Sequence, residues 1–305
     1  MKRIRLGLTM SLVLITSACT AKTADEPISK AAIAPTQSIK QDAPAMAYDQ
    51  AKKAVVETPS PSSVLYFIYQ KDGDGASSYE IENGSWATYW YGYRFEFGGK
   101  QYFTGFAQQT REKFGQSEEE DYPGPGTKVA ITQATYILAH PDTDRPWSFE
   151  GAQRYVGDFG GYEKANEIDQ ARQPQEYRTQ DKRMVLAIPT WYLASGTEID
   201  SYELFLFDPK EILKIEDVRW AYLGNVETGE DNSAACDEQD GGNLRCVKRT
   251  GELSFVADQD TGLPVIRVAM SGTGVAASDG KSSLHGVDAV REYRYDSATK
   301  KYLER

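Results

Sequence analysis

The sequence is poor in the residues that enzymes most often use for catalysis and metal binding. Its 305 residues include only two histidines, His140 and His285, and three cysteines. Neither histidine lies in an HExxH motif or at metal-ligand spacing from a cysteine, and no GxSxG elbow is present. The glycine-rich stretches DGDG and SGTG lack the lysine of a phosphate-binding loop. We therefore expect no metal and no cofactor, and these motifs identify no catalytic residue.

Basic residues are scarce relative to acidic ones. The chain has 34 Lys and Arg against 45 Asp and Glu, a formal net charge of −11. A chain of this sign repels the phosphate backbone of nucleic acids and anionic lipid headgroups. We therefore expect no nucleic-acid partner. Acidity of this kind is most simply a solubility device dispersed over the surface, with binding of a cation or a basic partner as the alternative.

No apolar stretch near the start is long enough to span a bilayer. Lys2, Arg3 and Arg5 are followed by an uncharged, mostly apolar run over 6–17. A spanning helix needs about 20 such residues. A basic start, a short apolar run and small residues after it are typical of an export signal.

The end of this segment resembles the lipobox of bacterial lipoprotein signal peptides. The residues that carry the resemblance are Ile15, Thr16, Ser17, Ala18 and Cys19. It implies that residues 1–18 are removed, that the Cys19 thiol accepts lipid, and that the mature protein is held in a membrane without a spanning segment. Thr20, a residue other than Asp, implies release to the outer membrane, with the body facing the periplasm or the cell surface. An ordinary cleaved signal peptide without lipid is the alternative.

The two remaining cysteines form one even pair. Cys236 and Cys246 flank the run DEQDGGNLR, whose glycines suit a tight loop. In an oxidising compartment such a pair predicts a disulfide. A metal site is the more specific alternative to a disulfide, but two thiolates with no histidine nearby make a poor zinc site.

Composition divides the mature chain into a tether and a β-rich body. Residues 19–62 are rich in Ala, Lys, Thr, Ser, Pro and Gln and almost free of aromatics, which predicts a flexible tether. From 63 onward, dense aromatic and β-branched runs alternate with turn residues. We expect one β-rich lobe over 63–160, a polar linker or insertion over 161–183, and a second β-rich lobe over 184–305. Whether these lobes are one domain or two stays open.

The fold class predicted for the body is mainly β, with antiparallel sheets as a sandwich or barrel and one or two short helices. Strands are predicted near 64–70, 86–97, 100–107, 128–138, 184–193, 202–207, 218–224, 251–257, 264–270 and 289–295. Helices are predicted only over 162–172 and 209–213. The clearest hairpin turns at Gly98 and Gly99, and YRYDSATKKY near the carboxyl end predicts a second.

Four residues are candidate ligand contacts. Strand periodicity over 86–97 places the odd-numbered aromatics, Tyr89 to Phe97, on a core face and leaves Trp86 and Trp90 on the less buried face. Their flat rings there could stack on a sugar or a peptide, unless a second layer covers them. Trp147, in a predicted loop, is another exposed ring, with Arg145 nearby for an anionic group. Core positions are expected for Trp191 and Trp220.

These observations favour a lipid-anchored envelope protein that binds a protein or glycan partner without catalysis. The first alternative is an envelope hydrolase that uses carboxylates such as Asp142, Asp144 and Asp158, because paired acids can divide acid and base roles. The second alternative is a structural role in envelope maintenance. We interpret His140 as an exposed turn residue. His285 has serines near it in the sequence, but the members of a catalytic triad meet through the fold, so this proximity does not indicate a triad.

Overall fold

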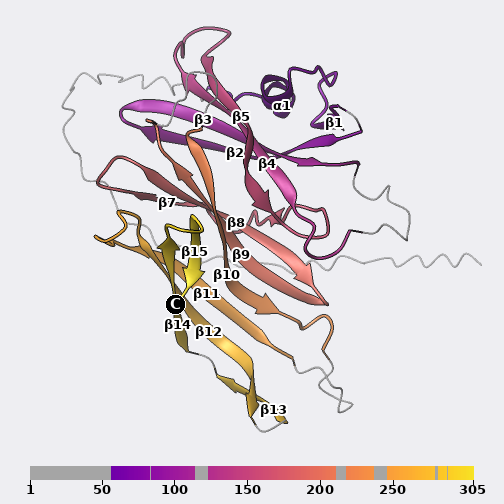
Figure 1. Cartoon of the computed structure of the whole chain (residues 1–305), viewed down its shortest axis with the longest axis vertical. Coiled ribbons are helices and arrows are strands. Elements are labelled where there is room, and N and C mark those ends of the chain that lie inside the picture. The colour runs from indigo at the N-terminus through magenta and orange to yellow at the C-terminus, as the bar shows by residue number, and fades with distance from the viewer. Residues whose placement is uncertain are drawn as a thin grey trace, which may run out of the picture. The chain divides into compact units, whose positions relative to one another are not determined.

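The computed structural model describes residues 56–82, 84–113, 123–210, 218–236, 246–278, 281–286 and 288–305. These residues belong to one compact unit. Figure 1 shows one short helix and two antiparallel sheets in this part of the chain. The predicted fold class, mainly β with antiparallel sheets, is confirmed.

The first sheet has five strands that follow one another in sequence order. They are β1 (Ser78–Glu80), β2 (Trp86–Phe97), β3 (Lys100–Thr110), β4 (Val129–Leu138) and β5 (Trp147–Phe159). Each strand pairs with the next, so the sheet is a meander built from local connections. The residues that begin β5 were predicted to lie in a loop.

The second sheet has ten strands. In sheet order they are β15 (Lys301–Glu304), β14 (Ala289–Asp296), β12 (Val265–Ser278), β11 (Lys248–Val256), β10 (Trp220–Asp231), β9 (Thr197–Phe207), β8 (Met184–Ala194) and β6 (Glu167–Ile168), with β13 (Lys281–Gly286) on β12 and β7 (Gln175–Arg178) on β8. The second predicted hairpin is present as β14 and β15, and β12 and β14 extend past their predicted ends.

The strand predicted over 64–70 is wrong, because these residues lie in α1 (Pro61–Tyr69). A dense run of aromatic and β-branched residues suggested a strand, but the capping residues decide for a helix. The Ser60 side chain accepts a hydrogen bond from the Ser63 N–H, and Pro61 occupies the first turn, where its missing N–H costs nothing. Gln70 ends the helix in a left-handed conformation.

The helix covers one face of the first sheet, and the second sheet packs on the other. Val64, Leu65 and Ile68 of α1 are buried against Phe103 and Tyr136 of β3 and β4. Figure 1 shows α1 lying over this sheet. The main core fills the space between the sheets with rings from both, and Trp220 lies in it as predicted, 2% exposed.

Strand β8 is buried on both faces, which explains its continuous apolar run. Met184 and Leu186 point into the core between the sheets, whereas Val185 and Ala187 belong to a separate core formed by the second sheet itself. Adjacent residues of a strand point to opposite faces, so a strand between two cores has no polar alternation.

A β-bulge in β2 overturns the predicted division of its faces. The pairing with β3 shifts register between Tyr89 and Tyr91, which makes Trp90 an extra residue. Tyr89 therefore packs with α1 in the outer core, while Tyr91 and Phe95 pack in the core between the sheets. Trp90 packs against that same core and stacks edge-on against Phe159 at 4.8 Å. The second sheet therefore covers Trp90, which was the alternative to an exposed, ligand-binding ring at this position.

Two local predictions are confirmed and one is wrong. Gly98 and Gly99 turn the β2–β3 hairpin with positive φ angles of 57° and 75°. Cys236 and Cys246 form a disulfide. The helix predicted over 162–172 is wrong, because this segment consists of turns and the short strand β6, which pairs with β8. Of the helix predicted over 209–213, only 209 and 210 lie within the described residues, in a turn.

Strands β5 and β10 join the two sheets through a buried side chain. The Gln153 amide donates to the Trp220 carbonyl and accepts from the Trp220 N–H, each at 3.0 Å. The side chain thereby satisfies both backbone groups of Trp220, as a neighbouring strand would. Close to it, Gly157 lets the strands approach, because a Cβ there would lie 2.7 Å from the Cβ of Tyr222.

Candidate functional site

A cavity of about 530 Å³ opens where the end of β5 meets strands β8, β9 and β10. Its volume lies within the range of small-ligand sites. The residues that matter most for its chemistry are Asn166, Trp191, Tyr192, Glu203, Tyr222 and Asn225. We call it the Glu203 cavity. It combines apolar walls with a few convergent polar groups, the combination expected of a binding or active site.

Glu203 forms the floor of this cavity and is fully buried. The Tyr222 hydroxyl donates to its Oε2 at 2.6 Å. The side-chain amides of Asn166 and Asn225 both donate to its Oε1, at 2.6 and 2.9 Å. Three donors therefore hold the carboxyl group in one orientation.

Burial has the largest effect on the pKa of the Glu203 carboxyl group. It raises the pKa of the Glu203 carboxyl above its ordinary value of 4.5, against the three hydrogen bonds and the charge of Lys128, which lower it. Burial, with the adjacent charge of Glu203, also raises the pKa of Tyr222. The site thus keeps an acid whose charged form lacks most of its solvation.

The segment 160–168 supplies one wall and is held by both sheets. Trp90 donates from its indole nitrogen to the Asn166 carbonyl at 2.9 Å, and the Ala165 N–H donates to the Gln108 side chain at 3.1 Å. On the other side β6 pairs with β8. Trp90 therefore acts on the cavity indirectly, by positioning the residue that contacts Glu203.

Exposed apolar side chains surround the mouth of the cavity. Tyr162 is 52% exposed and Leu193 is 63% exposed, and both line the cavity. Tyr162 and the next residue, Glu163, have left-handed backbones with φ of 53° and 54°. Such conformations cost about 1–3 kcal/mol each and are enriched at functional sites. Trp191, half-buried on β8, adds a flat ring to the same wall.

The charges near the cavity are close to balance. Lys164 pairs with Glu167 at 2.6 Å on the rim. Lys301 lies on the Tyr222 side of the floor, where its Nζ donates to the Tyr222 carbonyl at 2.7 Å and sits 4.1 Å from the ring centroid. Burial, with the charge of Lys128, lowers the pKa of Lys301. Among the described residues no lysine or arginine forms an ion pair with Glu203 itself.

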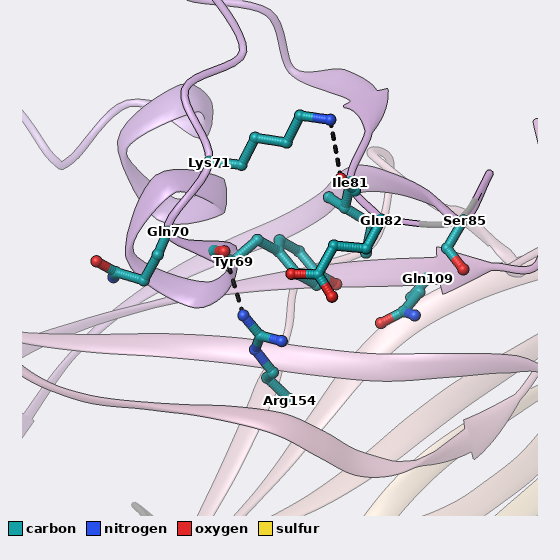
Figure 2. Close-up of a pocket in the computed structure, with 8 residues that line it drawn as sticks. All are labelled: Tyr69, Gln70, Lys71, Ile81, Glu82, Ser85, Gln109 and Arg154. Carbon is teal, nitrogen blue, oxygen red and sulfur yellow. Dashed lines mark hydrogen bonds between the residues drawn. The ribbon is translucent and has the colours of Figure 1, made fainter.

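A second cavity, of about 450 Å³, lies at the end of α1 and is mostly polar (Figure 2). Its two cationic side chains, Lys71 and Arg154, donate hydrogen bonds to backbone carbonyls. Lys71 donates to the Ile81 carbonyl at 2.8 Å, and Arg154 donates to the carbonyls of Ile68 and Tyr69 at 3.3 and 3.2 Å. The Arg154 bonds satisfy carbonyls that the helix end leaves free, and the Lys71 bond ties the segment after the helix to the segment that follows β1. This cavity is best explained by helix capping.

The structure does not bring the four candidate ligand contacts together. Trp86 donates to the Ser78 hydroxyl at 2.6 Å and carries Lys113 over its ring. Trp147 packs in the outer core, with its indole nitrogen 2.6 Å from the Glu57 carbonyl. Arg145 is exposed in the turn between β4 and β5. None of these three lines the Glu203 cavity, and Trp90 contacts two residues of its lining, Asn166 and Phe159.

The other residues singled out from the sequence are also dispersed. Asp142 and Asp144 are exposed in the β4–β5 turn, together with His140. Asp158 accepts a hydrogen bond from Tyr155 at 2.7 Å on β5. His285 lies in β13, and its side chain is outside the described part of the chain, as is Cys19.

Sequence reasoning missed Glu203 and misplaced Trp191, for which a core position was predicted. A signal for Glu203 was present. The acid interrupts the run YELFLF, and an ionisable residue inside a strand this apolar must be buried or paired. Its partners Asn166 and Asn225 carry no such signal, since they come from other segments and meet Glu203 only through the fold.

No family model, curated protein or solved structure matches this chain. Within the described ranges, no helix is long and apolar enough to cross a membrane. No group of three or more His, Cys, Asp or Glu side chains in the same ranges is placed to hold a metal ion.

Proposed function

We propose that this chain is a lipid-anchored protein of the cell envelope that binds a short glycan in the Glu203 cavity without cleaving it. The observation that carries the proposal is the pairing of aromatic rings at the mouth, Tyr162 and Trp191, with hydrogen-bonding amides on the floor. Sugars present flat apolar faces and a rim of hydroxyls, and this pairing suits both.

Binding without turnover is supported by the state of the one acid in the cavity floor. Glu203 is fully buried, and both carboxyl oxygens already accept hydrogen bonds from protein donors. A general acid or base must reach the proton that it transfers. Lipid anchoring at Cys19 and an outer-membrane location are supported by the signal-like start, and an oxidising compartment agrees with the disulfide.

The test uses the full-length protein purified in detergent and three soluble probes, cellotriose, chitotriose and the trimer of glucosamine, titrated by calorimetry. At least one trisaccharide should bind. Trp191→Ala should weaken that binding about tenfold, which corresponds to about 1.4 kcal/mol of lost stacking. Trp86→Ala is the matched control, because it removes a half-buried Trp that does not line the cavity.

Three results would contradict the proposal. The first is that no trisaccharide binds. The second is that Trp86→Ala weakens binding as much as Trp191→Ala does. The third is that mass spectrometry finds the bound trisaccharide cleaved after incubation, which would favour the hydrolase instead.

A further inference from the structure

Glu203 fixes the orientation of two amide groups in the cavity. Asn166 and Asn225 approach the same carboxyl oxygen, at 2.6 and 2.9 Å. That oxygen accepts both hydrogen bonds, so both amides turn their NH2 groups toward it. Their carbonyl oxygens, Oδ1, then point away from Glu203.

These two Oδ1 atoms are acceptors in need of a donor. No described residue donates to either of them. Asn166 is only 9% exposed. Among the described residues, the Nε of Arg249 is the one side-chain polar atom that is both fully buried and without a partner, so the unpartnered Asn166 Oδ1 is not fully buried. The Asn166 Oδ1 therefore keeps access to solvent, and the cavity that Asn166 lines is where this access lies. Acceptors held in such a place favour a ligand that brings hydrogen-bond donors.

The electrostatics of the floor favour a positive charge among those donors. Glu203 lies behind the two amides and forms no ion pair with a described lysine or arginine, so burial disfavours its charged form. An ammonium group bound at the two Oδ1 atoms would stabilise that charged form, whereas Lys128 and Lys301 affect it only at longer range. Lys128 is exposed, where solvent screens it, and Lys164 is neutralised by Glu167. Aromatic rings such as Trp191 and Tyr192 add faces that attract cations.

We infer that the Glu203 cavity selects a ligand with a primary ammonium group, which for a saccharide means an amino sugar that is not acetylated. The inference rests on the proposed function for the saccharide part. The ammonium donates to the Oδ1 atoms of Asn166 and Asn225, above the buried carboxylate. Glu203 is a positioning residue in this arrangement, because it acts through the two amides.

The three trisaccharides of the binding experiment test this directly. They share a β-1,4-linked glucose backbone and differ at C2, where they carry a hydroxyl, an acetamido or an ammonium group. At a pH below the pKa of the sugar amine, the glucosamine trimer should bind at least tenfold more tightly than cellotriose or chitotriose. Glu203→Gln should remove this preference, leaving the glucosamine trimer within about threefold of cellotriose.

The reason is that a glutamine at 203 carries no charge. Its carboxamide oxygen can still accept from both asparagine amides, and its NH2 group then takes the place of Oε2 beside the Tyr222 hydroxyl. The two Oδ1 atoms keep their orientation and the size of the side chain hardly changes, so the variant removes only the negative charge behind them. Asn225→Leu is the second variant. It deletes one Oδ1 acceptor together with one of the three hydrogen bonds to Glu203, and it should weaken binding of the glucosamine trimer more than binding of cellotriose.

Glu198→Gln is the charge control. It removes one exposed carboxylate from the same strand, outside the cavity lining, and should leave the preference unchanged. Saccharide binding with no ammonium preference, or a preference that Glu203→Gln leaves intact, would overturn this inference and leave the proposed function standing. An equal loss of preference in Glu198→Gln would also overturn it, because net charge would then be the cause. Absence of binding to all three sugars would instead remove the proposed function.

Discussion

At the scale of single residues, the unusual feature is a fully buried acid that forms no ion pair with any lysine or arginine of the described segments. Glu203 is held by Tyr222, Asn166 and Asn225, which are all neutral donors. Hydrogen bonds to a charged group contribute about 1.5–3 kcal/mol each, but they replace only part of the solvation lost on burial. Folding therefore favours the protonated form of this side chain.

This imbalance makes stability depend on pH with a definite sign. The pKa of Glu203 is raised above 4.5 in the folded state, so the folded protein binds the proton more tightly than the unfolded chain does. The stability contribution is complete below 4.5 and is lost as pH rises toward the folded pKa. Relative to Glu203→Gln, the wild type should lose about 1.4 kcal/mol per pH unit across that interval.

Urea unfolding of the wild type, Glu203→Gln and Glu198→Gln at a series of pH values measures this effect. Glu198 is exposed on the same strand, so the unfolding free energy of its variant should follow that of the wild type. A constant difference between the wild type and Glu203→Gln from acid to neutral pH would contradict the expectation.

At the scale of elements, the sequence predicted most strands but not the exceptions that shape the site. Alternation and turn residues located β2, β3, β4 and β8 within a few residues. Residue type failed as a guide at α1, where Ser60 and Pro61 override it. Alternation failed at Trp90, where a bulge reverses the faces. A bulge depends on pairing with another strand, so local periodicity carries no sign of it.

The approach of β5 to β10 depends on the missing side chain of Gly157. An alanine Cβ there would lie 2.7 Å from the Cβ of Tyr222, a contact that backbone shifts must relieve. We expect Gly157→Ala to lower the unfolding free energy by about 1–3 kcal/mol, measured by urea denaturation.

Gly124→Ala is the matched control for this substitution. Gly124 has no atom within 4 Å of an added Cβ and does not require a positive φ. Its variant should be as stable as the wild type or slightly more so, through lower entropy of the unfolded chain. Equal stability of the two alanine variants would show that the strands have room to separate at Gly157.

At the scale of the whole molecule, the proposed location depends on the first 19 residues, which lie outside the described part of the chain. If Cys19 carries lipid, the expressed protein should partition into the detergent phase of a Triton X-114 separation. Cys19→Ala should abolish this partitioning, because several buried acyl chains contribute about 0.8 kcal/mol for each methylene.

The control uses the other two cysteines of the chain. A Cys236→Ser, Cys246→Ser double variant loses the disulfide, with up to about 2.8 kcal/mol of chain-entropy stabilisation for a loop of about 11 residues. It keeps Cys19 and should still enter the detergent phase. Partitioning of the wild type into the aqueous phase would support an ordinary cleaved signal peptide.

The junction ahead of α1 has a mechanical consequence if the amino end is anchored as proposed. Arg94 donates to the Val56 carbonyl at 3.3 Å, and Trp147 donates to the Glu57 carbonyl at 2.6 Å. The Arg94 guanidinium also lies 5.4 Å from the centre of the Trp147 ring. Any force applied through the amino-terminal segment thus reaches strands β2 and β5 before it reaches the helix. Tension at the amino end would load the first sheet through these two side chains, in parallel with the covalent path into α1.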